Sequence, residues 1–374
     1  MSYHGRFEQA KQPKQPGKKK GLKIFLIVIA VILALLLILA GAAYLYLQSK
    51  LKKMNIIELP KDTYAYTEPT DEVTRPPETG AAETTEATTE ATVPKMTADD
   101  IINILVVGQA ARAGEESYMA DSTMLVSINT YTKEINCMSV LRDSLVKLPD
   151  YKGHQCGKAK FTVCYNLGHM WGDTAGAMEM TNICLKDNFG VEVDYDVEVS
   201  FDGFIKMIDY IDGVDIELTQ AEADYLNKDT LYVKRTIEPG VQRLQGMEAL
   251  SYARMRKAAG DSESDIKRTE RQRKVVEALL ERFRYMSLSK LNNWVDILMP
   301  MVTTTMTPTD VTKLAAKILP LLPELKIKGY TIPMEGWGDM VDIYDNGEIH
   351  SVMRFDTAKE KKLIRAITEA EVSD

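Results

Sequence analysis

Two arginines, Arg254 and Arg256, stand two positions apart in a segment whose other residues are mostly apolar. If residues 252–256 are extended, both guanidinium groups lie on one face, because side chains alternate along a strand. The planar guanidinium fork matches the oxygens of a phosphate group and is favoured wherever an oxyanion is held by paired hydrogen bonds. The pair therefore indicates an oxyanion-binding site.

A second group of polar side chains follows after a polar connection. A helix that begins near residue 266 would place Arg268, Arg271 and Gln272 on one face, because residues three and four positions apart are neighbours on a helix. Two converging elements would then aim guanidinium and amide groups at one point. The alternative is a solvated helix face, which charge runs usually form, and Glu270 and Lys274 on the same helix are consistent with it.

Length and composition limit the kind of protein that these groups can belong to. The chain has 374 residues, of which 45% are hydrophobic, and a formal net charge of −8. This length allows about two domains, and the apolar fraction can build a sizeable core. The acidic balance gives no general reason to expect nucleic acid as a partner.

The N-terminal region is typical of a membrane anchor. Residues 1–23 carry seven basic side chains and one acid, whereas residues 24–47 contain no charged residue. A helix of that length spans about 36 Å, enough to cross a bilayer core, and it is too long for a cleaved signal peptide. By the positive-inside rule we expect a cytoplasmic tail over 1–23, a single transmembrane helix over 24–47, and an extracellular location for the rest of the chain.

Residues 48–98 predict a linker between the membrane and a folded domain. From residue 61 onward this region is rich in Thr, Glu and Pro, with near-repeats after residue 83. Such a composition cannot bury a core, so we expect a disordered extracytoplasmic stalk.

The folded part is expected to begin near residue 99. Apolar runs at 101–107, 123–128 and 135–141 are typical of buried strands, and the turn composition between the last two predicts an antiparallel hairpin. Loops held by a buried sheet are where sites are usually built. Polar residues stand at the ends of these strands, namely Arg112, Asp121 and Arg142.

Further elements follow the hairpin in mixed order. The pattern predicts a loop entering a helix at 151–168, a helix at 175–189, a strand at 191–201, a helix at 202–211, a short strand at 213–216, an amphipathic helix at 267–285, helical segments at 289–301 and 309–321, and a last strand-like piece at 330–332. Strands mixed with helices predict a layered α/β domain. We expect this domain over residues 99–286, with residues 287–374 as a C-terminal extension packed on it.

Several common chemistries find no support in the sequence. It contains no Gly-x-Gly-x-x-Gly, Walker, Gly-x-Ser-x-Gly or His-Glu-x-x-His motif, and its four cysteines lack zinc-ligand spacing. A Cys156–Cys164 disulfide is one possibility outside the membrane, although connectivity cannot be derived from spacing. Cys137 and Cys184 lie in apolar patterns, where buried free thiols are common.

Short motifs along residues 103–284 resemble one known family. They are NILVVG at 103–108, DSTM at 121–124, VSIN at 126–129, LRD at 141–143, the segment 204–214 and, most specifically, LQGMEALSYARMR at 244–256 with DIKRTERQ at 265–272. Together with the tail, span and linker, they resemble the LytR-CpsA-Psr proteins of bacterial envelopes. The resemblance implies an α/β fold with a central mixed, largely antiparallel sheet flanked by helices.

The resemblance also implies a phosphotransferase of the cell envelope. Such an enzyme takes a glycopolymer from an undecaprenyl-pyrophosphate-type carrier and attaches it to peptidoglycan, with the lipid tail in an apolar tunnel between sheet and helices. Arginines and a magnesium ion would bind the pyrophosphate, as the chemistry of phosphoryl transfer requires. The implied catalytic residues are Asp121, Arg142, Arg254, Arg256 and Asp265. The implied phosphate contacts are Arg112, Lys160, Arg268, Arg271 and Gln272, and Asp121 is the implied metal ligand.

Two positions depart from the family's pattern. Ala110 stands where the family usually has an aspartate that binds metal, and Met119 stands where it usually has a phosphate-binding arginine. Magnesium prefers one or two carboxylates together with substrate phosphates. These changes raise the alternative of a degenerate paralogue that binds the lipid-linked substrate, or regulates ligases, with little catalysis. A transcriptional attenuator is a third class, which the predicted topology disfavours because the folded domain cannot reach DNA.

Overall fold

The computed structural model describes residues 49, 53–59, 96–109, 120–256, 258, 264–287, 290, 293, 297, 299–345 and 348–369. The predicted transmembrane segment and most of the predicted linker lie outside these residues, as does most of the predicted helix at 289–301. Within the described residues, no helix is both long enough and apolar enough to cross a membrane.

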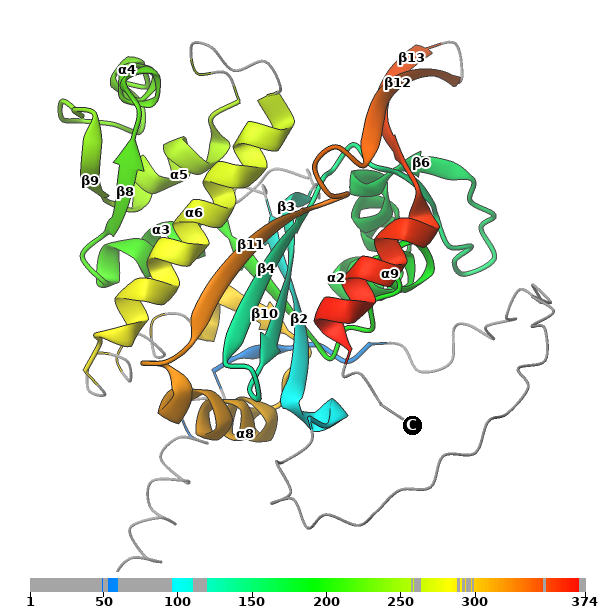
Figure 1. Cartoon of the computed structure of the whole chain (residues 1–374), viewed down its shortest axis with the longest axis horizontal. Coiled ribbons are helices and arrows are strands. Elements are labelled where there is room, and N and C mark those ends of the chain that lie inside the picture. The colour runs from blue at the N-terminus through cyan, green and yellow to red at the C-terminus, as the bar shows by residue number, and fades with distance from the viewer. Residues whose placement is uncertain are drawn as a thin grey trace, which may run out of the picture. The chain divides into compact units, whose positions relative to one another are not determined.

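A mixed sheet forms the centre of the fold (Figure 1). Within the described residues it has seven strands, in the order β1-β10-β7-β2-β3-β4-β11. Their bounds are Asn55–Ile56 (β1), Val302–Thr304 (β10), Tyr195–Ser200 (β7), Ile101–Gln109 (β2), Ala120–Asn129 (β3), Glu134–Val140 (β4) and Lys326–Ile332 (β11).

The sheet is mixed, as predicted, but it is not largely antiparallel. β2, β3 and β4 are antiparallel neighbours, and β10 pairs antiparallel with β7. The pairs β2–β7, β4–β11 and β1–β10 are parallel. Half of the pairings described are therefore parallel. β7 and β11 each enter the sheet after a long connection that contains helices. A connection of this kind lets a strand run parallel to the neighbour with which it pairs.

The early strand predictions are confirmed. The apolar runs at 101–107, 123–128 and 135–141 form β2, β3 and β4, and the last two make the predicted hairpin. Leu105, Leu125 and Met138 contribute fully buried side chains to the main core, where they meet Phe189 and other residues of the neighbouring helix. The predicted strands at 191–201 and 213–216 are β7 and β8 (Val214–Leu218), and β8 pairs with β9 (Gly240–Leu244).

Helices lie on both sides of the sheet (Figure 1). α2 and α9 are on one side, and α3, α5 and α6 are on the other. The helix bounds are Phe161–Phe189 (α2), Phe201–Tyr210 (α3), Gln220–Lys228 (α4), Gly246–Arg254 (α5), Ser264–Arg284 (α6), Pro308–Ile318 (α8) and Thr357–Thr368 (α9). The arrangement of helices around a mixed sheet agrees with the predicted α/β class.

α2 folds back on itself in its middle. The backbone is not helical at Gly172 and Asp173, so the two predicted helical stretches become the two arms of one hairpin. The arms approach so closely that a Cβ atom on Gly168 would lie 2.5 Å from the carbonyl oxygen of Gly176. Glycine at this crossing therefore lets the two arms pack directly against each other.

The C-terminal part of the chain holds more structure than predicted. The piece at 330–332 belongs to β11, which begins at Lys326, and it is not the last strand. β12 (Gly338–Asp345) and β13 (Glu348–Phe355) form an antiparallel hairpin, and α9 follows it. Acidic residues along β12 hide its pattern, because Asp is depleted in strands. The domain boundary at residue 286 stays a prediction, although strands from both sides of it share the central sheet.

The four cysteines are free thiols. Cys137 and Cys184 are buried, which confirms the expectation for both. The possible Cys156–Cys164 disulfide is not formed: Cys164 is fully buried and its Sγ donates to the carbonyl oxygen of Met180 at 3.2 Å, whereas Cys156 lies half-buried in a loop.

Candidate functional site

The arginine pair at 254 and 256 lies at a helix end and not on a strand. α5 runs from Gly246 to Arg254, so the expectation of an extended segment at 252–256 is wrong for its first three residues. A capping box between Gln245 and Glu248 starts this helix, and its Ala, Leu and Met residues favour helix over strand. Arg254 is therefore the last helical residue, and Arg256 follows one residue beyond the cap, Met255.

The guanidinium group of Arg254 is held over two aromatic rings. Its central carbon lies 5.1 Å from the centroid of the Phe201 ring and 5.9 Å from that of the Tyr232 ring. One of its nitrogens also donates to the Tyr232 hydroxyl at 3.2 Å. Cation–π contacts of this kind orient a guanidinium without neutralising its charge. Arg254 and Arg256 are both exposed, so their charge is accessible to a ligand.

The predicted helix that carries the second polar group is confirmed as α6. Arg268 and Thr269 are buried, with Arg268 only 4% exposed, and Gln272 is half-buried. All three line a narrow cleft together with Arg142. The other lining residues are Ala120, Ser122 and Thr123 of β3, Val140 of β4, and Phe161 and Thr162 at the start of α2. The structure thus brings Arg142, Arg268 and Gln272 together, as the sequence predicted.

This cleft is small, and the charged residues in its described lining are both arginines. Its described lining offers guanidinium, hydroxyl and amide groups but no carboxylate. The N-terminal end of α2 adds the positive end of a helix dipole. The cleft has a volume of about 10 Å³, which is the space of a single water molecule. A phosphate group would therefore enter only if the surrounding side chains moved apart.

Lys160 and Arg142 are both near Asp143. The Lys160 ammonium lies 2.9 Å from the Asp143 carboxylate, and the Arg142 guanidinium lies 3.9 Å from the same oxygen. The backbone ties this corner together, because the Thr162 amide donates to the Arg142 carbonyl oxygen at 3.0 Å. The Thr162 hydroxyl is buried and finds no hydrogen-bond partner among the described residues. It is therefore a polar group that a bound ligand could engage.

Arg271 points away from the cleft. Its Nε donates to the Glu222 carboxylate at 2.8 Å, and a terminal nitrogen donates to the Met255 carbonyl oxygen at 3.2 Å. Both charged side chains are buried, 5% and 7% exposed. Burial opposes ionisation of Glu222, but hydrogen bonds from the Thr219 backbone and from Arg271 outweigh it and hold the pKa of that carboxyl below its usual value.

The remaining predicted site residues fall outside what the structure describes. Arg112, Ala110 and Met119 lie in the undescribed segment 110–119, and the side chains of Asp121 and Asp265 are likewise outside the described part. Among the described residues no three His, Cys, Asp or Glu side chains could together hold a metal ion. The described cleft does not by itself make a magnesium site, so magnesium remains a prediction that depends on Asp121.

Sequence reasoning missed three residues that shape this region: Phe201, Tyr232 and Glu222. Thr219 and Glu222 do show the spacing of a capping box, and the structure confirms one at the start of α4. No local pattern joins Glu222 to Arg271, however, because 49 positions separate them. The same holds for the aromatic rings around Arg254.

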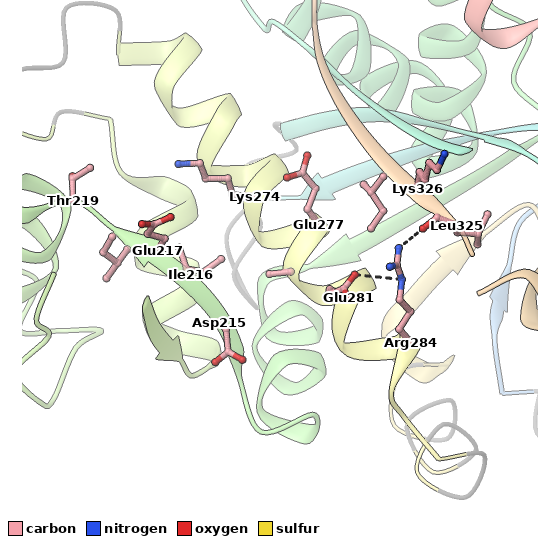
Figure 2. A pocket seen from close by; sticks show the side chains of 13 residues that line it. Asp215, Ile216, Glu217, Thr219, Lys274, Glu277, Glu281, Arg284, Leu325 and Lys326 are labelled. Atoms are coloured by element: carbon pink, nitrogen blue, oxygen red, sulfur yellow. Dashed lines mark hydrogen bonds and ion pairs between the residues drawn. The ribbon is translucent and has the colours of Figure 1, made fainter. Parts of the chain in front are cut away.

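A second hollow lies on the opposite side of α6 (Figure 2). It is an open groove of about 760 Å³ between β8, α6 and the start of β11. Its charges are mixed and largely compensated: Glu281 lies 3.3 Å from the Arg284 guanidinium, which also donates to the Leu325 carbonyl oxygen. Asp215 accepts from Arg243 at 2.8 Å. The groove therefore mixes acids and bases, whereas the charged residues in the described lining of the cleft are both arginines.

Comparison with known proteins identifies the family of this chain and similar folds. The model of the LytR_cpsA_psr family matches residues 72–361. The regulatory protein MsrR of Staphylococcus aureus (strain COL) is 30% identical over 252 residues, which cover 67% of this chain and 69% of MsrR. The chain therefore belongs to the LytR-CpsA-Psr family, as its motifs predicted.

Other relatives carry more specific names. The polyisoprenyl-teichoic acid–peptidoglycan teichoic acid transferase TagU of Oceanobacillus iheyensis is 29% identical over 202 residues, or 53% of this chain and 57% of TagU. The structure of TagT bound to LIIa-WTA has a TM-score of 0.55 and 24% identity, and covers 72% of this chain and 92% of TagT. TagT with a bound octaprenyl pyrophosphate lipid has a TM-score of 0.52 and 20% identity, over 74% of this chain and 94% of TagT. These structures confirm the fold.

Proposed function

We propose that this protein is a phosphotransferase that moves a glycopolymer from a polyprenyl-pyrophosphate carrier to peptidoglycan. The observation that carries the proposal is the convergence of Arg142, Arg268 and Gln272 on one cleft that has no carboxylate in its described lining. Such a site suits a phosphate-rich anion. The printed name of TagU and the lipid bound to TagT support a polyprenyl pyrophosphate as that anion.

Positioning and charge neutralisation account for most of the catalysis of phosphoryl transfer. An acceptor hydroxyl of peptidoglycan attacks the phosphorus that carries the glycopolymer, and its proton passes to water. A new phosphorus–oxygen bond forms, and the bond to the bridging oxygen breaks, so polyprenyl phosphate leaves. Arg142 and Arg268 donate to the phosphate oxygens as negative charge shifts onto the leaving group. The buried guanidinium of Arg268 acts where water screens charge weakly, which strengthens these bonds.

Magnesium is part of the proposal as a predicted cofactor. It would supply further neutralisation of the pyrophosphate charge, with Asp121 as the expected ligand.

The degenerate paralogue remains the second candidate function. The observation that favours it is the pair of replacements at Ala110 and Met119, which remove a carboxylate and a guanidinium from the family's pattern. The name of MsrR, a regulatory protein, is in line with it. In that case the chain would bind the lipid-linked polymer and transfer it slowly.

The location at the cell membrane is also proposed. It rests on the uncharged segment 24–47 and the basic tail before it. A protease added to intact protoplasts should release a fragment that begins within residues 60–98. Protection of residues 99–374, with cleavage in the first twenty, would show the opposite orientation.

The experiment that separates the two functions measures binding and transfer in the same preparation. Purified protein is given a radiolabelled, polyprenyl-pyrophosphate-linked glycopolymer and peptidoglycan, with and without Mg²⁺. A phosphotransferase should release polyprenyl phosphate and label the peptidoglycan, and Arg268→Ala should abolish both. Binding of the lipid without any label in peptidoglycan would support the second candidate, and absence of binding would exclude both.

A further inference from the structure

Arg271 and Glu222 form a buried ion pair next to the segment that carries Arg254 and Arg256. The geometry of this pair gives Arg271 a different role from the phosphate contact that was expected of it. On a helix, successive residues are about 100° apart. Arg268 therefore lies between Arg271 and Gln272 around the α6 axis. Arg268 and Gln272 face the cleft, whereas Arg271 faces α4 and the end of α5, where it meets Glu222 and Met255.

The ion pair is fully engaged on the Glu222 side. One carboxylate oxygen accepts from Arg271 at 2.8 Å. The other accepts from the Thr219 backbone amide at 3.0 Å and from the Thr219 hydroxyl at 3.2 Å, which closes the capping box of α4. A buried pair with this many hydrogen bonds is costly to break from one side only, because the remaining charge is left unpaired.

On the other side, Arg271 holds the backbone between the two exposed arginines. Met255 follows the last residue of α5, and it is fully buried. Carbonyl groups at a helix end have no partner within the helix, and the Met255 carbonyl finds one in the Arg271 guanidinium at 3.2 Å. One planar group thus joins α4, the end of α5 and α6. A lysine could not reproduce this fork, because its ammonium is a single point of contact.

We propose that the Arg271–Glu222 pair is a positioning element that fixes the segment carrying Arg254 and Arg256 against α6. Arg271 is then not a phosphate ligand. The inference rests on the proposed function for its ligand, a polyprenyl pyrophosphate, but the contacts that carry it are within the protein. It adds Glu222, which makes no contact with the cleft, to the residues on which substrate binding depends.

The test compares Glu222→Gln, Arg271→Lys and the double variant with a matched control. Arg235 and Glu248 form another Arg–Glu pair, 2.9 Å apart, at the opposite end of α5 from Met255. Glu248→Gln breaks that pair without touching the Met255 carbonyl. Affinity is measured by calorimetry with a soluble short-chain polyprenyl pyrophosphate, thermal unfolding reports stability, and hydrogen exchange of the peptide that contains residues 255 and 256 reports the held segment.

Glu222→Gln and Arg271→Lys should each weaken binding about tenfold, because an exposed arginine whose segment is no longer held would lose about one charge-assisted hydrogen bond to the ligand. The double variant should be no weaker than either single, because both remove the same constraint. Exchange at residues 255 and 256 should become faster in all three variants. Glu248→Gln should lower the melting temperature while affinity and exchange at 255–256 stay as in the wild type.

Two results would overturn the proposal. A loss of affinity in Arg271→Lys but not in Glu222→Gln would mean that Arg271 contacts the phosphate directly. Unchanged exchange at residues 255 and 256 in Glu222→Gln would mean that the pair does not hold this segment. If the wild type binds no polyprenyl pyrophosphate, the proposed function fails, and the exchange measurement still decides the role of the pair.

Discussion

The two sides of α6 differ in how many charged residues they carry and in what surrounds those residues. On the cleft side, Arg268 is buried next to hydroxyl and amide groups, with Arg142 opposite and no carboxylate in the described lining. On the groove side, Lys274, Glu277 and Glu281 lie among acids and bases that compensate one another (Figure 2). The two sides therefore differ in the burial of their charged groups and in the sign of those charges within the described lining, and the side with fewer charges is the candidate phosphate site.

The largest effect should come from the buried cleft arginine. Arg268→Ala removes hydrogen bonds to a charged ligand, each worth about 1.5–3 kcal/mol, so affinity for a polyprenyl pyrophosphate should fall about ten- to a hundredfold. Arg268→Lys keeps the charge without the planar fork and should fall between this variant and the wild type. Calorimetric titration measures both.

The matched control for this prediction is Lys274→Ala, which removes an exposed cation from the groove side of the same helix. Affinity should stay within twofold of the wild type, on the order of what screened surface charges contribute. Equal losses at Arg268 and Lys274 would show a diffuse attraction instead of a built site, and the contrast between the two sides would disappear.

The next effect concerns the carboxylate and guanidinium that the family usually has. Ala110→Asp together with Met119→Arg should raise transfer by roughly tenfold for each 1.4 kcal/mol gained at the transition state. The new carboxylate is a hard oxygen ligand, so the Mg²⁺ concentration needed for half-maximal transfer should fall. A transfer assay with metal titration compares the wild type, both singles and the double. Wild-type transfer that already saturates with Mg²⁺ and is unchanged in the double variant would mean that another side chain binds the metal in place of the carboxylate missing at Ala110.

A smaller effect is expected at the exposed arginines. Arg254→Ala or Arg256→Ala should weaken polyprenyl pyrophosphate binding by about tenfold, since water screens an exposed charge more than a buried one. Arg273 on α6 is unsuitable as a neutral control, because its guanidinium donates to the Tyr330 carbonyl at 2.9 Å and to the Thr331 hydroxyl at 3.1 Å. Lys274→Ala serves here too, and unaltered binding in both arginine variants would restrict the site to the cleft.

The smallest effect should appear on the groove side and should involve stability alone. Burial raises the pKa of Glu277 above its usual 4.5, against the opposing charges of Arg273 and Lys274. A raised carboxyl pKa stabilises the folded protein below pH 4.5, and this contribution is lost as the pH rises through the folded-state value. Glu277→Gln should therefore flatten the dependence of unfolding free energy on pH just above 4.5. Urea titrations at several pH values measure it, and an unchanged profile would contradict the assignment.

The sequence predicted those elements of the fold whose signal lies within one continuous stretch of residues. The apolar run at 101–107, the hairpin after it and the amphipathic helix at 267–285 all show their periodicity in a single stretch, and each is confirmed. An extended segment at 252–256 is consistent with the alternation of its residues, but its first three residues belong to α5, whose start is fixed by the capping box of Gln245 and Glu248.

Long-range contacts left no such signal. The parallel pairing of β11 with β4 joins Lys326 to Glu134, and nothing near either residue indicates the other. The candidate site shows the same contrast between local signals and long-range contacts. Arg268 and Gln272 could be placed by helical spacing, whereas the true partner of Arg271 depends on how α4 packs against α6. Spacing alone put Arg271 on the wrong face.

The two edges of the central sheet also set the order in which the molecule can fold. β1 near residue 55 pairs with β10 near residue 303, and β4 receives β11 only from residue 326 onward. The hairpin of β3 and β4 can form early from neighbouring residues, but closing loops of this length costs entropy before any contact is gained. Folding of this domain is therefore expected to be slow and to wait for nearly the whole chain. A chain that stops before residue 326 would leave the edge of β4 that faces β11 unpaired, while its other edge still pairs with β3. An open strand edge of that kind is where aggregation begins.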